Sequence, residues 1–131
     1  MAGKYDHISF KPPTGVRSAA KRGLEYRKKA APSRKGGLDV KEASKAGIGS
    51  GVQRASDLVN ADEISPAVVR RMHAFFSRHE KNKGVDPKYR ETPWNDKGYV
   101  SWLLWGGDAG QSWAAKVVRQ MDAADETQYL K

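Results

Sequence analysis

One small group of residues has the side chains that acid–base chemistry requires. His73, His79 and Glu80 lie close together in the chain, and an imidazole beside a carboxylate can move a proton or help to bind a metal ion. The histidines are six residues apart, so a helix would turn them to different faces, and the zinc-protease spacing His-Glu-x-x-His is absent. A nuclease that uses these residues is one alternative. The main prediction is a non-enzymatic protein with no catalytic residue, metal or cofactor.

Lysines and arginines are concentrated on one predicted helix. Between Thr14 and about Ala30, the residues Val16, Ala20 and Leu24 recur every four positions, which predicts a helix with one apolar stripe. Its other faces carry six cations: Arg17, Lys21, Arg22, Arg27, Lys28 and Lys29. Cations this close repel one another unless an anion neutralises them. The phosphates of nucleic acid do so and release counterions, although a solvated basic face is the alternative.

The predicted nucleic-acid contacts extend beyond this helix. Tyr26 lies among the cations and can stack on a base. Further contacts come from the polar link at 31–37, from Ser50 in a glycine-rich turn and from Arg54 in the predicted helix at 51–60. The complete predicted set is Arg17, Lys21, Arg22, Tyr26, Lys28, Lys29, Arg34, Lys35, Ser50 and Arg54. Lysines and arginines of this kind mainly contact the backbone, so we expect little base specificity.

A glycine-rich turn, Gly47-Ile48-Gly49-Ser50-Gly51, leads into a predicted helix at 51–60. Such turns can aim N–H groups at a phosphate, but the Lys and Ser/Thr of a nucleotide-binding P-loop are missing here. A structural turn and a backbone-phosphate contact both stay open. Residues 40–58 also have part of the spacing of a helix-turn-helix, but Gln53 stands where that motif needs a buried aliphatic residue.

The second half of the chain supplies the predicted core. Ser65 as N-cap and Pro66 at the first helical position predict a helix that runs to about Lys81. Its apolar face consists of Val68, Met72, Phe75, Phe76 and His79. A long loop at 82–95, a buried helix at 97–105 and a last helix at 111–125 follow, with Asp108 as the predicted N-cap of the last one.

Five aromatic residues near the C-terminus have two interpretations. Trp94, Tyr99, Trp102, Trp105 and Trp113 can form a stacking platform for a single strand, or they can fill the core. Helical spacing and the neighbouring leucines favour the core. Trp94, between prolines and polar residues, is expected to be the most exposed of the five.

These elements define an all-α fold. We predict a compact bundle of five or six short helices, including one at 39–46, with an extended N-terminal arm at 1–13. Residues 14–131 form a single small domain, with a basic part at 14–54 and an aromatic, core-forming part at 64–125. The apolar stripe of the basic helix predicts that it docks on the aromatic core. The segment from Tyr5 to Phe10 is left to strap onto a protein neighbour.

The net charge is asymmetric. Residues 1–54 hold 13 Lys and Arg against 4 Asp and Glu, whereas residues 55–131 hold 11 of each, so the whole net charge of +9 lies at one end. This pattern predicts a negatively charged partner. The chain has no cysteine, which excludes disulfides and cysteine zinc sites, and no apolar run long enough to predict a membrane span.

Four strings of residues occur together: GVRSAAKRGLE at 15–25, GSGVQRA at 49–55, ISP at 64–66 followed by RMHAFFSRHE at 71–80, and WLLWGGDAG at 102–110. The combination resembles a small domain of poorly defined function encoded by tailed bacteriophages, cyanobacterial phages among them. In some phage proteins a similar segment lies beside head-maturation or other virion modules. The likeness covers residues 14–120. It implies a phage origin and a virion context, and it brings no catalytic residue with it.

Three functions follow as expectations. The first is a phage-type basic helical protein that binds nucleic acid through backbone phosphates, with DNA rather than RNA as the expected partner. The second is a structural virion protein, capsid-associated or cementing, that lies on packaged DNA or on the acidic surface of a phage structural protein. The third is an inhibitor or adaptor of a host enzyme. The expected location is the host cytoplasm during infection or the virion.

Overall fold

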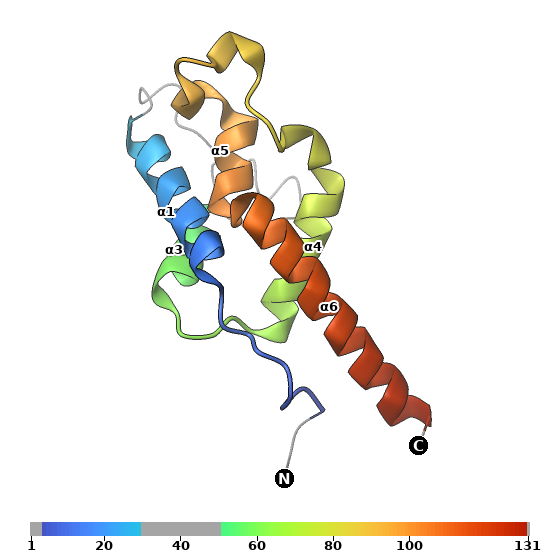
Figure 1. Cartoon of the computed structure of the whole chain (residues 1–131). Coiled ribbons are helices and arrows are strands. Elements are labelled where there is room, and N and C mark those ends of the chain that lie inside the picture. Colours follow the sequence, from blue (N-terminus) through green and yellow to red (C-terminus); the bar gives the residue numbers. More distant parts are fainter. Residues whose placement is uncertain (1–3, 30–50, 131) are drawn as a thin grey trace.

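The computed structural model describes residues 4–29 and 51–130, and all regular structure within these ranges is helical (Figure 1). The α-helices are α1 (Thr14–Lys29), α3 (Gly51–Asn60), α4 (Pro66–Arg78), α5 (Lys97–Leu104) and α6 (Gly107–Leu130). Short 3-10 helices at η2 (Glu80–Asn82), η3 (Pro87–Tyr89) and η4 (Pro93–Asn95) interrupt the predicted loop. The all-α prediction is confirmed. The predicted helix at 39–46 and the predicted contacts Arg34, Lys35 and Ser50 lie outside the described residues.

Helix α4 begins as the sequence predicts. The Ser65 side chain accepts a hydrogen bond from the backbone N–H of Val68 at 3.3 Å, and Pro66 follows in the first turn. The helix ends at Arg78, a few residues before the predicted end, and the chain tightens into η2. The buried face contains Val69, whereas the predicted Val68 is only half-buried.

The basic helix α1 docks on the core by its apolar stripe, as predicted. Val16 and Ala20 are fully buried, Leu24 is half-buried, and α1 contacts α3, α5 and α6. Its approach to α5 is very close at Gly23, where an added Cβ would lie 2.8 Å from the backbone nitrogen of Leu104. Figure 1 shows α1 and α5 side by side as a result. The positive charge therefore lies on a helix that is fixed to the fold.

Aromatic rings from α4, from α5 and from the residue that follows α5 make the centre of the core. Phe75 and Trp105 stack with centroids 4.6 Å apart, and Phe76 meets Trp102 edge to face at 4.7 Å. Trp102, Trp105 and Trp113 are at most 6% exposed. For these three residues the core interpretation is confirmed, and a stacking platform that includes them is wrong.

The turn between α5 and α6 differs from the prediction. Gly106 and Gly107 have φ values of +118° and +64°, which side chains rarely adopt, so the chain reverses there in two residues. Helix α6 consequently begins at Gly107, before the predicted start, and continues to Leu130, past the predicted end. Asp108 lies inside the first turn and is not the N-cap. Its carboxylate accepts a hydrogen bond from Trp102 Nε1 at 2.8 Å.

The described part of the arm, residues 4–13, packs on its own domain. Ile8 and Phe10 are buried in the core, and the carbonyl oxygen of Phe10 accepts a hydrogen bond from the backbone N–H of Ile64 at 3.0 Å. The prediction that residues 5–10 are left to strap onto a protein neighbour is therefore wrong. The hydrophobic side chains that a neighbour would cover are already covered.

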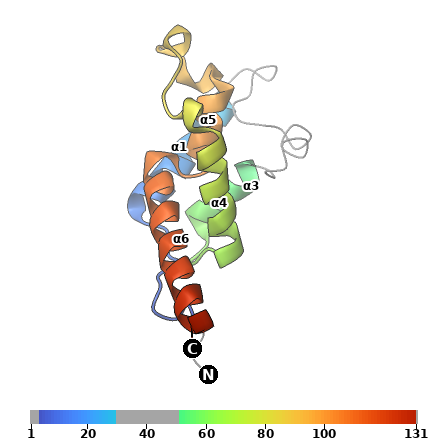
Figure 2. The same ribbon diagram turned by 90° about the vertical axis from the view of Figure 1, so that its right-hand side faces the viewer.

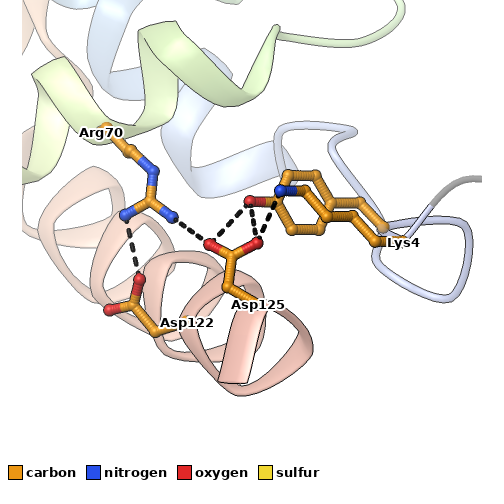
Figure 3. Close-up of polar contacts among 5 residues, drawn as sticks. Lys4, Arg70, Asp122 and Asp125 are labelled. Atoms are coloured by element: carbon orange, nitrogen blue, oxygen red, sulfur yellow. Dashed lines mark hydrogen bonds and ion pairs between the residues drawn. The ribbon is translucent and has the colours of Figure 1, made fainter. Parts of the chain in front are cut away.

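One ion pair and the Tyr5 hydroxyl, both on the Asp125 carboxylate, hold the arm to α6 (Figure 3). The Tyr5 hydroxyl donates to Asp125 at 2.8 Å, and Lys4 Nζ lies 2.9 Å from the same carboxylate. Arg70 of α4 joins Asp125 to Asp122 through both terminal nitrogens of its guanidinium. The arm and the C-terminal part of α6 thus lie at one end of the molecule, in the view of Figure 2 as in Figure 1.

Candidate nucleic-acid interface

Four cations of α1 point to solvent in two rows. Lys21 and Lys28 form one row, and Arg22 and Lys29 form the other; all four are exposed, and we name this set the α1 outer face. Each row spans seven residues, which is two turns or about 10 Å along the helix axis. Glu25 is the only carboxylate on α1, so the face keeps a strong positive charge. No salt bridge joins these four cations to another described residue.

The cations at the end of α1 are partly stabilised by the helix itself. Arg27, Lys28 and Lys29 occupy the last turn of α1, where the negative end of the helix dipole stabilises positive charge. A solvated basic helix end is therefore stable without a ligand. The α1 outer face differs from such a helix end in its neighbours. Aromatic and cationic side chains from segments far along the chain lie beside it.

An aromatic pair borders the end of α1. Lys29 Nζ lies 4.0 Å from the centre of the Trp94 ring, and Tyr26 meets the same ring edge to face at 6.2 Å. Both Tyr26 and Trp94 are half-buried, so each keeps part of its surface open to solvent. Bases can stack on such rings while phosphates contact the neighbouring cations. The structure thus brings the predicted residue Tyr26 together with Trp94, which comes from η4.

Arg17 has an internal role that the sequence did not reveal. Its Nη1 donates to the carbonyl oxygens of Leu58 and Val59 at 3.2 and 3.1 Å, and its Nε donates to that of Pro12 at 3.2 Å. The last carbonyls of a helix have no partner within it, and here a guanidinium supplies one for α3. Arg17 fastens α1 to α3, and its donors are largely used within the fold.

Arg54 also faces inward. It is 7% exposed, its guanidinium lies 5.3 Å from the centre of the Trp105 ring, and Nη1 pairs with Asp57 at 3.3 Å. Burial lowers its pKa more than the Asp57 carboxylate raises it. A phosphate outside the protein cannot reach a guanidinium that is buried in this way. The structure therefore places the predicted contacts Arg17 and Arg54 away from the α1 outer face.

A hollow of about 280 Å³ opens beside the first turns of α1. Its walls come from α1, from α5 and from the start of α6, and Lys83 closes one side. The charged and hydroxyl-bearing residues that line it are Ser18, Arg22, Lys83, Tyr99 and Asp108. Burial raises the pKa of Tyr99 above its usual value, more than the adjacent Arg22 lowers it, so the phenol stays protonated and can donate.

The residues of the nuclease alternative have other partners. His79 caps the end of α4 through its backbone N–H, and its ring lies 4.8 Å from that of Phe75, so it is the core-edge residue that its position predicts. Burial lowers the pKa of His79, helped by Lys81 and Arg78. The Glu80 carboxylate accepts from Gln111. In the part of the chain that the structure describes, no group of three His, Asp or Glu side chains is placed to hold a metal ion.

Sequence reasoning missed Lys83 and underused two aromatic residues. Lys83 lies in a predicted loop, and no local pattern indicates that it lines the same hollow as Arg22. For Trp94 and Tyr99 the sequence offered a stacking platform or the core, but not a place beside the basic helix, and both border α1 in the fold. The one sequence signal available was the position of Trp94 in a loop with two prolines, which predicts exposure.

Comparison with known proteins adds no relative. No protein-family model, curated protein or solved structure matches the chain. The resemblance to a phage domain therefore stays a prediction from sequence. Among the described helices, none is both long and apolar enough to cross a membrane.

Proposed function

We propose that this protein binds nucleic acid, with DNA rather than RNA as the expected partner, without catalysing a reaction, and that backbone phosphates lie on the α1 outer face. The observation that carries the proposal is the pairing of exposed cations with half-buried aromatic rings along one helix edge, Lys29 with Trp94 above all. Phosphate neutralisation supplies affinity and counterion release, and stacking adds a contribution that tolerates any base.

The contact set of the proposal keeps five of the residues that the sequence predicts and adds Trp94. Lys21, Arg22, Lys28 and Lys29 contact phosphate, and Tyr26 and Trp94 stack on bases. Arg17 and Arg54 support the face from within because they hold α1 and α3 in place. None of these groups reads a base edge with fixed geometry, so the proposal includes little sequence specificity.

The same charge pattern also predicts the two alternatives, a structural role in the virion and binding to a host enzyme. Both would use the α1 outer face against an acidic protein surface. The burial of Ile8 and Phe10 removes the apolar strap that a capsid neighbour would have bound. Nucleic acid is the partner that uses both the cations and the rings, and we therefore propose it first.

A charge-removal comparison tests the proposal. Fluorescence anisotropy of short single-stranded and double-stranded oligonucleotides at low salt compares the wild type with Lys21→Gln/Lys28→Gln. We expect the double variant to bind at least about fivefold more weakly, because two phosphate contacts are lost. Lys116→Gln/Arg119→Gln removes the same charge from exposed positions of α6 and should change affinity less than about twofold. Equal losses in both variants, or no binding by the wild type, would contradict the proposal.

A further inference from the structure

The hollow beside α1 collects positive charge from two separate elements. Arg22 comes from α1 and Lys83 from the segment after η2, 61 positions later in the chain, yet both line the same space. Two cations that line one hollow suit an anion of more than one charge. A phosphodiester in the middle of a strand carries one negative charge, whereas a terminal phosphomonoester carries about 1.5 to 2 at neutral pH.

The hollow also continues the α1 outer face. Arg22 belongs to both, and the two lie along the same edge of α1, with Trp94 beside one end and the hollow beside the other. A strand whose phosphates follow α1 therefore reaches the hollow at one of its ends. A volume of about 280 Å³ is at the lower limit for small-ligand sites, which fits one terminal group and excludes a duplex.

The other polar groups of the hollow suit a phosphate that is joined to a sugar. Ser18 and Tyr99 can donate hydroxyl hydrogens, and the Asp108 carboxylate can accept one from a sugar hydroxyl. Asp108 also opposes the phosphate charge, so it limits the affinity. Lys83 Nζ is held in the apo fold by a long hydrogen bond of 3.4 Å to Gln111, which a phosphate oxygen can replace.

We propose that this hollow binds a phosphomonoester at the end of a nucleic-acid strand, with Arg22 and Lys83 as its cationic ligands. The proposal rests on the proposed function, since the rest of the strand lies on the α1 outer face. It adds a preference for strand ends to a surface that otherwise reads no sequence. A 5′-phosphate and a 3′-phosphate offer the same chemistry, and the experiment separates them.

The test uses three single strands of one sequence: 5′-phosphorylated, 3′-phosphorylated and unphosphorylated. We expect the wild type to bind one phosphorylated strand about five- to tenfold more tightly than the unphosphorylated strand. Lys83→Gln should abolish this preference and leave the affinity for the unphosphorylated strand unchanged. Asp108→Asn keeps the acceptor for Trp102 and removes the opposing charge, so the preference should increase. Lys28→Gln, the matched control, should lower the affinity for all three strands equally.

The outcomes separate the two proposals. Equal wild-type affinity for all three strands, or a preference that survives in Lys83→Gln, overturns the strand-end site and leaves the nucleic-acid proposal standing. If no strand binds, the nucleic-acid proposal fails. A titration with a nucleoside monophosphate, followed by NMR, then tests binding of a phosphomonoester to the hollow by itself. A chemical-shift change at the Trp102 indole N–H that Lys83→Gln removes would support the site, and no change would overturn it.

Discussion

The guanidinium of Arg17 donates a hydrogen bond to the carbonyl oxygen of Val59 at 3.1 Å and so ties the basic helix α1 to the end of α3. The same nitrogen reaches Leu58, and Nε reaches Pro12 on the arm. One cation of the basic helix thus joins three segments, while its neighbours Lys21 and Lys28 face solvent. Some cations of α1 therefore stabilise the fold, and others are exposed on its surface.

Arg17→Ala should destabilise the protein by about 1–3 kcal/mol, because it leaves helix-end carbonyls without their charged donor. Lys28→Ala removes the same charge from an exposed position and should change the free energy of unfolding by less than about 0.5 kcal/mol. Urea denaturation of both variants at one pH measures the difference. Equal stabilities for the two variants would show that the Arg17 hydrogen bonds contribute nothing.

Gly23→Ala should destabilise the protein although alanine favours helix. The new Cβ would lie 2.8 Å from the backbone nitrogen of Leu104, so α1 and α5 must separate, at a cost of about 1–3 kcal/mol. Gly84→Ala is the control, since an added Cβ there meets nothing within 4 Å. Thermal unfolding should show a lower Tm for the first variant and an unchanged or higher Tm for the second. A Tm for Gly23→Ala at or above that of the wild type would mean that the contact is not close.

The docking of the arm should depend on acid pH. Hydrogen bonds from Lys4 and Tyr5 lower the pKa of Asp125 below its usual value. A carboxyl whose pKa is lowered by folding contributes stability above its unfolded pKa, near 3.8, and loses that contribution as the pH falls through the folded pKa. NMR signals of the Tyr5 ring should report release of the arm below about pH 3.8. Asp125→Asn should show a weakened arm at neutral pH and no such transition; an identical transition in this variant would assign it to other groups.

Trp94 should be the tryptophan that senses nucleic acid. Trp102, Trp105 and Trp113 are buried, whereas Trp94 is half-buried beside Lys29. Addition of a single strand should quench tryptophan fluorescence in the wild type, because a base stacks on the exposed part of the ring. Trp94→Phe keeps a smaller ring for stacking and should lose most of the quenching. Undiminished quenching in Trp94→Phe would move the contact elsewhere.

Local sequence patterns predicted most of the helices. The capping signal of Ser65 and Pro66 and the stripe of Val16, Ala20 and Leu24 depend on neighbours in the chain, and both helices begin where these signals place them. The start of α6 was predicted too late because Gly106 and Gly107 both adopt positive φ. The turn therefore needs fewer residues than the glycine-rich stretch 106–110 indicates. Asp108 then falls inside the helix.

The candidate site was predicted less completely, because its chemistry depends on contacts between distant segments. Lysine and arginine spacing located α1 as the basic element. It could not show that Arg17 faces the end of α3 or that Arg54 lies against Trp105. The positions of Trp94 and Lys83 beside α1 likewise follow from the tertiary fold. The prediction for the arm was wrong because the burial of Ile8 and Phe10 depends on core residues that lie far along the chain.

The salt dependence of DNA binding tests the central claim most directly. Four phosphate contacts on the α1 outer face predict that log K falls with log salt concentration with a slope of about −3.6 for duplex and about −2.8 for single strands. Lys21→Gln/Lys28→Gln should reduce the duplex slope by about 1.8, and Lys116→Gln/Arg119→Gln should leave it unchanged. An affinity that does not depend on salt, or a slope that the α1 variant leaves as steep as the wild type, would contradict phosphate binding by α1.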